Sequence, residues 1–92
     1  MSSNLPQIIM YARERFCPDV ARSRMHLEEL GLAWQEFDIE SDPEALARTR
    51  KLTGRQNVPT IVVGDSVLVE PSNDLLDKAL IAAGYVLDEV EA

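Results

Sequence analysis

The chain has 92 residues, of which 46% are hydrophobic, and its formal net charge is −7. This length suffices for one hydrophobic core and not for two, so we expect a single domain over residues 1–92. The negative charge disfavours nucleic acid and anionic membranes as partners, and the apolar runs are far shorter than the roughly 20 residues of a membrane span. Residues 1–4 lack the basic and apolar regions of a signal peptide, so a cytoplasmic location is expected.

The first half of the chain predicts a strand, a helix, a second strand and a second helix. Residues 7–12 are apolar and short enough for a buried strand, and Pro18 fits the first position of a helix that ends at Gly31. The apolar stripe expected on this helix consists of Val20, Ser23, Leu27 and Leu30. A strand over residues 33–39 and a helix over residues 41–54 follow, which gives a βαβ unit with parallel strands.

The second half predicts a hairpin and a final helix. Residues 60–63 and 67–69 are rich in β-branched and apolar side chains, and Gly64-Asp65-Ser66 between them is typical of a hairpin turn. Ser72 can cap the last helix and Gly84 can end it. The face expected to pack inward consists of Leu75, Leu76, Ala79, Leu80 and Ala83. The predicted order is therefore βαβαββα.

Cys17 is the only cysteine, and it stands at the start of the first predicted helix. Amide N–H groups and the helix dipole favour the deprotonated form of a thiol there, and the thiolate is the nucleophile. A single cysteine forms no intrachain disulfide, so its oxidation must join it to another molecule. The alternative is that Cys17 is merely a small buried hydrophobic residue. His26, the only histidine, is expected to be a surface or half-buried helix residue, and no metal site is expected.

The basic residues are concentrated in two segments, with four between Arg13 and Arg24 and four between Arg48 and Arg55. Four of them, Arg22, Arg24, Arg48 and Arg50, are expected to lie on solvated helix faces. Arg13, Arg15 and Arg55 instead flank predicted loops, where their charge can act on Cys17 or on a bound anion.

Val58-Pro59-Thr60 is a second informative segment. Pro59 immediately precedes a predicted strand, and its peptide bond is either cis or an ordinary trans bond. A cis bond would leave the N–H and C=O of Val58 unpaired and facing outward. Such an edge pairs with an extended peptide, which would bring a substrate sulfur toward Cys17.

Together these residues resemble the glutaredoxin family of the thioredoxin fold. The likeness extends from Gln7 to Tyr85, and its two motifs are Cys17-Pro18 and the segment that runs from Leu52 to Thr60. It implies an α/β, thioredoxin-like fold: a four-stranded mixed sheet with helices on both faces. The Pro71-Ser72 step before the last helix is similar to the glutaredoxin-like and mycoredoxin group of actinobacteria and related bacteria.

The resemblance also implies roles for individual residues. Cys17 would be the nucleophile, and Val58-Pro59 would hold the substrate backbone. Asn73 and Asp74 would receive the γ-glutamyl or equivalent polar end of a thiol. A terminal carboxylate would be held by either Arg13 or Arg15, with Arg55 or Gln56 as a second contact.

The implied activity is that of a monothiol thiol–disulfide oxidoreductase. Val20 stands where dithiol relatives carry a second cysteine, so the cycle would use an external low-molecular-weight thiol and no bound cofactor. Glutathione, mycothiol and bacillithiol are the alternatives, and Glu70-Pro71, in place of a common Gly-Gly pair, weighs against glutathione. The partners would be this thiol and proteins in mixed disulfides, with the oligomeric state left open. A non-catalytic binding module and a glutathione-bridged dimer holding a [2Fe–2S] cluster are the rival interpretations.

Overall fold

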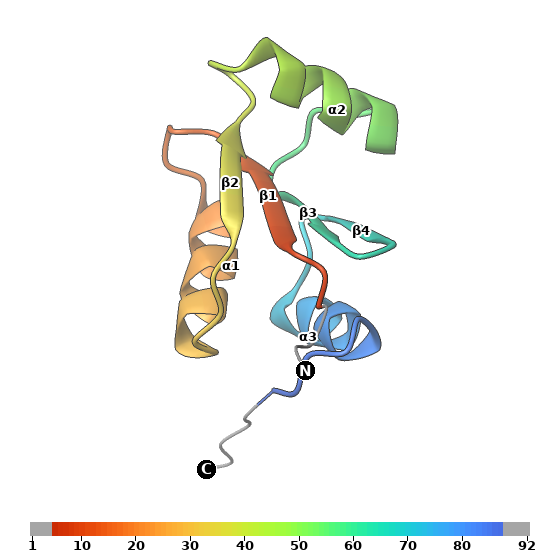
Figure 1. Ribbon diagram of the computed structural model, residues 1–92. Coiled ribbons are helices and arrows are strands. Elements are labelled where there is room, and N and C mark those ends of the chain that lie inside the picture. Colours follow the sequence, from red (N-terminus) through yellow and green to blue (C-terminus); the bar gives the residue numbers. More distant parts are fainter. Residues whose placement is uncertain (1–4, 88–92) are drawn as a thin grey trace.

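A computed structural model describes residues 5–87, so both ends of the expected domain lie outside the described residues. The elements follow the predicted order (Figure 1). They are β1 (Ile8–Ala12), α1 (Pro18–Glu29), β2 (Gln35–Asp38), α2 (Pro43–Thr53), β3 (Thr60–Val63), β4 (Ser66–Val69) and α3 (Asn73–Ala82). Within the described part of the chain, no helix is long and apolar enough to cross a bilayer.

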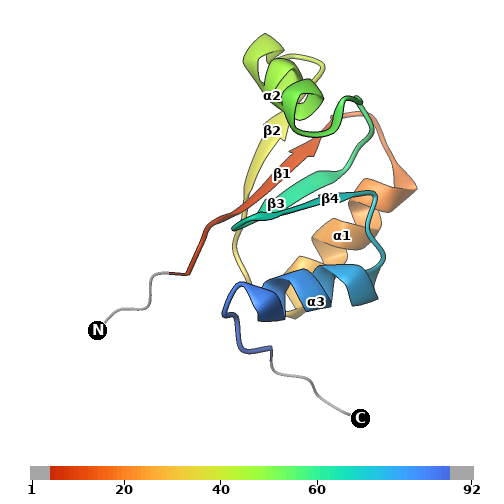
Figure 2. The same cartoon turned by 90° about the vertical axis from the view of Figure 1, so that its right-hand side faces the viewer.

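The strands form one four-stranded mixed sheet in the order β2-β1-β3-β4. β1 pairs with β2 in parallel and with β3 in antiparallel orientation, and β3 pairs with β4 in antiparallel orientation. Figure 2 shows α2 on one side of this sheet and α1 and α3 on the other. The predicted mixed sheet with helices on both faces is therefore confirmed.

The alternation of side chains along β1 separates the two faces of the sheet. Met10 is paired with Glu36 of β2, which bonds to Arg24 of α1, so Met10 faces α1. Tyr11, the next residue, accepts a hydrogen bond from Arg48 of α2 and so faces α2. The even-numbered positions of β1 are buried, and the main core lies between the sheet and the pair α1 and α3.

The helix ends follow the local signals in the sequence. The side chain of Asp42 accepts hydrogen bonds from the backbone N–H groups of Glu44 at 3.1 Å and Ala45 at 3.3 Å, which caps α2. Ser72 caps α3 by accepting from the N–H of Leu75 at 3.2 Å. Gly54 ends α2 with φ of 76°, a conformation that glycine adopts without steric cost.

One residue that the sequence assigns to the core is exposed in the structure. Leu75 is 51% exposed, whereas Leu76, Ala79 and Leu80 of the same helix are buried. Successive residues of an α-helix are rotated by about 100°, so the stripe that starts at Leu76 turns Leu75 away from the sheet. The inclusion of Leu75 in the inward face was wrong.

Candidate functional site

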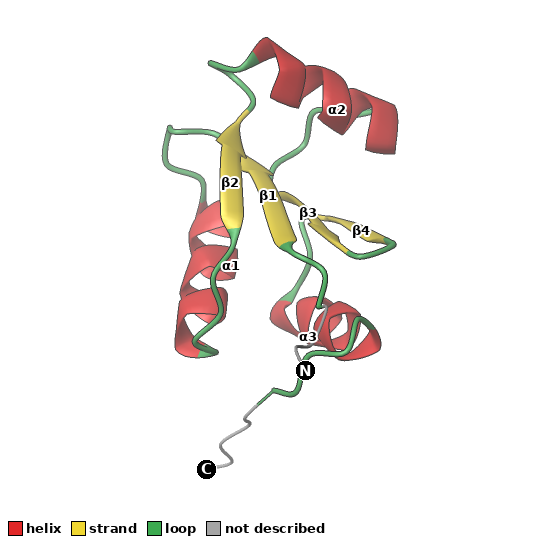
Figure 3. Ribbon diagram, in the orientation of Figure 1, coloured by secondary structure: helices red, strands yellow, loops and turns green. Residues whose placement is uncertain are grey.

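Three loops meet at one end of the sheet because of the strand register. Tyr11 near the end of β1 pairs with Thr60 at the start of β3, and Thr60 pairs with Val69 at the end of β4. The loop to Cys17, the Val58-Pro59 segment and the connection to α3 therefore begin or end side by side. Figure 3 shows the loops that follow β1 and α2 at this same end.

Cys17 occupies the N-cap position of α1. Its backbone is extended, with φ of −143° and ψ of 119°, and its carbonyl accepts the hydrogen bond from the N–H of Ala21 at 2.9 Å. The residue is half-buried and packs against the hydrophobic core, so it is not sealed from solvent. The sulfur thus lies at the end of α1 where the helix dipole favours negative charge.

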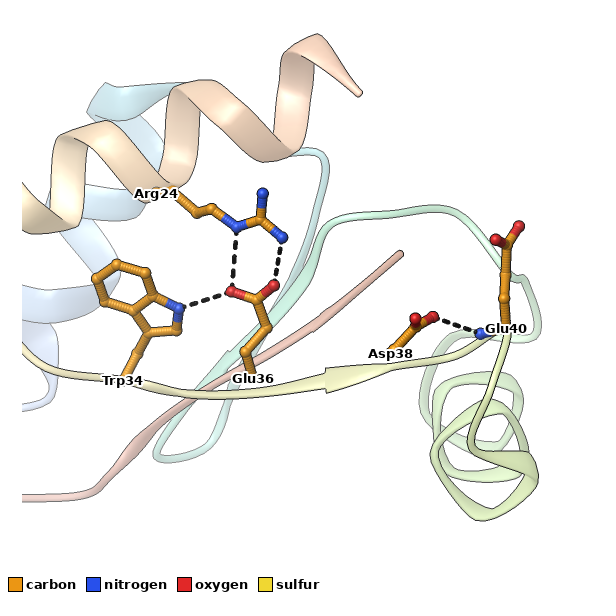
Figure 4. A network of polar contacts seen from close by, with 5 residues as sticks. All are labelled: Arg24, Trp34, Glu36, Asp38 and Glu40. Carbon is orange, nitrogen blue, oxygen red and sulfur yellow. Dashed lines mark hydrogen bonds and ion pairs between the residues drawn. The ribbon is translucent and has the colours of Figure 1, made fainter. Parts of the chain in front are cut away.

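Arg24, two turns along α1, connects this helix to β2 through Glu36 and Trp34 (Figure 4). The Nε atom of Arg24 donates to Oε1 of Glu36 at 3.2 Å, its Nη2 donates to Oε2, and the indole N–H of Trp34 donates to Oε1 at 3.0 Å. The hydrogen bond from Arg24 to Glu36 is the main reason why the pKa of Arg24 is raised, and the charge of a Cys17 thiolate raises it further. The guanidinium of Arg24 is therefore paired with Glu36 and ties α1 to β2.

The Val58-Pro59 peptide bond is cis. The carbonyl of Pro59 accepts from the N–H of Glu70 at 2.8 Å, and the Thr60 hydroxyl donates to the carbonyl of Asn57 at 2.9 Å. Within residues 5–87, the N–H and C=O of Val58 have no hydrogen-bond partner.

Val58 is only 2% exposed as a whole residue, because its side chain belongs to the hydrophobic core. The residue nevertheless lines the pocket described next, beside its unpaired main-chain groups.

A pocket of about 630 Å³ adjoins the Val58 segment. Its lining comprises Arg13, Arg50, Gly54, Arg55, Gln56, Asn57, Val58 and Glu70. Among the described residues, none of the three arginines has an ion-pair partner, while the carboxylate of Glu70 accepts from the side-chain amide of Asn57 at 2.9 Å. The pocket thus presents three guanidinium groups and one carboxylate.

The structure separates the two arginines between which the sequence did not choose. Arg13 lines the pocket, whereas Arg15 has a side chain that is 69% exposed and is bonded to Glu40 at 2.6 Å. Of the other predicted contacts, Arg55 and Gln56 also line the pocket. The site brings together Arg13, Arg55, Gln56 and Val58 and leaves Arg15 outside.

Arg50 is exposed, as predicted for a solvated helix face, but sequence reasoning missed that it lines the pocket. The backbone N–H of Gly54 donates to the carbonyl of Arg50 at 2.7 Å, so Arg50 stands in the last turn of α2 before the loop to Pro59. A local signal for this role was available in the sequence. Arg50 stands one turn before Gly54, which ends the helix and leads into the Val58-Pro59 segment.

Asn73 and Asp74 do not line this pocket; they stand in the first turn of α3. The guanidinium of Arg22 donates to the carbonyl of Pro71 at 3.3 Å, and Nε2 of His26 lies 2.7 Å from Oδ1 of Asp77. From the first contact to the second, the positions advance along both helices, so α1 and α3 run side by side in the same direction, with their N-termini at the same end. Asn73 and Asp74 therefore lie at the Cys17 end of the sheet.

Two residues near the start of α3 have unusual local features. The Oδ1 atom of Asn73 is buried and has no hydrogen-bond partner among the described residues. Glu70 has φ of 51°, a conformation that favours glycine, at the position where the resemblance places a Gly-Gly pair. His26 is a half-buried helix residue, and residues 5–87 contain no group of three potential metal ligands.

Comparison with known proteins decides the family. A family model described as glutaredoxin matches residues 8–68. The chain belongs to the glutaredoxin family. A search of curated proteins found no match. Family membership supports a role of the thiol–disulfide oxidoreductase kind for this glutaredoxin.

Solved structures share its fold. The glutaredoxin grx-1 from Archaeoglobus fulgidus is 22% identical, with a TM-score of 0.69 over 85% of this chain and 88% of that chain. The glutaredoxin-like NrdH-redoxin from Escherichia coli is 21% identical, with a TM-score of 0.68 over 78% and 92%. The glutaredoxin from Brucella melitensis is 25% identical, with a TM-score of 0.64 over 91% and 98%. The predicted thioredoxin-like fold is confirmed.

Proposed function

We propose that this glutaredoxin is a monothiol oxidoreductase that reduces mixed disulfides between proteins and a low-molecular-weight thiol. The observation that carries the proposal is the half-buried Cys17 at the N-terminus of α1, in a family that performs thiol–disulfide chemistry. Val20, at the place of a second thiol, is buried in the core and serves packing. An external thiol must therefore complete the cycle.

The reaction proceeds through two exchanges. The Cys17 thiolate attacks the small-thiol sulfur of the mixed disulfide, and the protein substrate leaves as a thiolate that takes a proton from solvent. A second small thiolate then attacks the small-thiol sulfur bound to Cys17. This step forms the small-molecule disulfide and restores the Cys17 thiolate. In the net exchange, one mixed disulfide and one small thiol give one protein thiol and one small-molecule disulfide, so the protein sulfur is reduced and the sulfur of the added thiol is oxidised.

The arginine pocket favours a thiol with an anionic end. Arg13, Arg50 and Arg55 supply three guanidinium groups, and a guanidinium pairs well with a carboxylate. The carboxylate of glutathione or bacillithiol fits this chemistry, while Asn73 and Asp74 at the start of α3 would bind the other polar end of the thiol.

We further propose that the reaction takes place in the cytoplasm of a bacterium, with proteins in mixed disulfides as partners.

Replacement of the nucleophile tests this proposal. Cys17→Ser is expected to abolish reduction of a glutathione-protein or bacillithiol-protein mixed disulfide and to leave the circular dichroism spectrum unchanged. Turnover retained by a folded Cys17→Ser protein would exclude the mechanism.

The unpaired main chain of Val58 favours one other candidate, a module that binds a partner through this segment and performs no catalysis. In that case Cys17 has no catalytic role. Mass spectrometry after incubation with glutathione, mycothiol and bacillithiol disulfides distinguishes the two. An adduct on Cys17 supports the oxidoreductase, and no adduct with any of the three supports the binding module.

A further inference from the structure

The sheet face that carries α2 is only partly covered. Ile9 of β1 pairs with Val62 of β3, and Val62 pairs with Val67 of β4, so the three side chains share this face. α2 lies over Tyr11, farther along β1. Ile9 and Val62 are half-buried and Val67 is 38% exposed, which leaves apolar surface beside the last turn of α2.

A cavity of about 470 Å³ opens at this place. It is lined by Ile9, Tyr11, Val62 and Leu52, with Arg48 and Lys51 from α2. Its size lies within the range of about 300–1,000 Å³ typical of small-molecule pockets, and such pockets are mostly apolar with a few polar groups that fix orientation.

The two cations of the cavity have charge available for a ligand. The guanidinium of Arg48 lies 5.0 Å from the centroid of the Phe37 ring and 5.7 Å from that of Tyr11, and its Nε donates to the Tyr11 hydroxyl at 3.1 Å. Its terminal Nη atoms have no hydrogen-bond partner within residues 5–87. Lys51 stands three residues later on α2 and has no ion-pair partner in the same part of the chain.

From this arrangement we propose a second binding site, for a small amphipathic anion in which one carboxylate is joined to an alkyl or aromatic body. The carboxylate pairs with Arg48 and Lys51, and the body covers Ile9 and Val62. A neutral apolar molecule would leave the cations unpaired, and an amphipathic cation would be repelled by them. Because α1 and Cys17 belong to the opposite face of the sheet, this site does not depend on the proposed redox function.

Octanoate is a suitable probe for this site in an amide NMR titration of the whole protein. We expect saturable shifts at Ile9, Lys51, Leu52 and Val62, and much weaker ones with acetate or octylammonium. Lys51→Glu should weaken octanoate binding about three- to tenfold, since a charge reversal at an exposed pair costs roughly 1 kcal/mol. Lys78→Glu is the matched control, because Lys78 is exposed on α3 across the sheet and undergoes the same change of charge.

Several results would overturn the site. These are no saturable shift at the four positions, equal binding of octylammonium, or an equal loss of affinity in Lys51→Glu and Lys78→Glu. Shifts at the same residues that grow with protein concentration in the absence of octanoate would show that a second copy of the chain occupies the surface, which also contradicts the proposal.

Discussion

At the scale of single residues, the two arginines before Cys17 differ because only one of them has a carboxylate partner. Arg13 and Arg15 are equivalent in sequence, since both are two-to-four residues from the thiol in one loop. In the structure, Arg15 is neutralised by Glu40, whereas Arg13 faces the pocket beside Val58. The difference arises because β2 ends at Asp38, which brings Glu40 close to Arg15. No pattern within the arginine loop specifies where Glu40 will lie.

The two arginines should therefore differ in their effect on the proposed reaction. Arg13→Gln is expected to raise the KM for an anionic thiol about three- to tenfold, because one charge-assisted contact is lost, with little change in kcat. Arg15→Gln is expected to alter KM by less than about twofold. Steady-state kinetics with glutathione or bacillithiol check this, and an equal effect of both variants would contradict the assignment of Arg13 to the pocket.

At the scale of elements, the helices and strands were predictable because their signals are local. Pro18, Asp42 and Ser72 begin helices, and Gly54 ends one, for reasons contained in a few neighbouring residues. The exposure of Leu75 was not predictable in the same way. It depends on how α3 is rotated against the sheet, which tertiary packing decides.

The adjacent leucines of α3 provide a matched test of that rotation. Leu76→Ala should lower the free energy of unfolding by about 2–5 kcal/mol, because Leu76 is 0% exposed and its loss leaves a cavity. Leu75→Ala should change it by no more than about 0.5 kcal/mol. Urea denaturation of the two variants measures both values, and similar losses would show that both side chains pack inward.

The contact between α1 and β2 predicts a pH dependence of stability. Burial raises the pKa of Glu36, but hydrogen bonds from Arg24 and Trp34 outweigh it, so the pKa lies below its usual value. A carboxyl group with a lowered pKa in the folded state stabilises the fold above its unfolded value of about 4.3, and this contribution is lost as the pH falls through the folded value.

Glu36→Gln removes this titrating group. It should lower the free energy of unfolding by about 0.5–1 kcal/mol at neutral pH, and the difference from the unchanged protein should shrink as the pH falls below about 4. Denaturation curves across this range check the prediction, with Glu29→Gln on the exposed side of α1 as the control. A difference that grows toward acid pH has the opposite sign and would contradict it.

At the scale of the whole molecule, topology creates the site. The antiparallel pairing of β1 with β3, and of β3 with β4, brings three loops distant in sequence to one end of the sheet. The sequence identified Cys17 and Val58-Pro59 because each has a local signature. It did not identify Arg50 or the burial of Val58, because both depend on how α2 and the core close around that end.

The net charge of −7 is unevenly distributed, because basic residues gather at two pockets. Arg50 and Arg55 line one pocket, and Arg48 and Lys51 line another. A bulk charge excludes polyanions as general partners but not small anions at such places. The composition was therefore a guide to partner class and not to the chemistry of individual sites.

The central claim is that Cys17 is an accessible, reactive nucleophile in the folded protein. Its most direct test is the rate of alkylation by iodoacetamide at pH 7, in the folded protein and in the protein unfolded in urea. We expect the folded protein to react faster than the unfolded chain. A folded protein that reacts no faster than the unfolded chain at neutral pH would contradict the account.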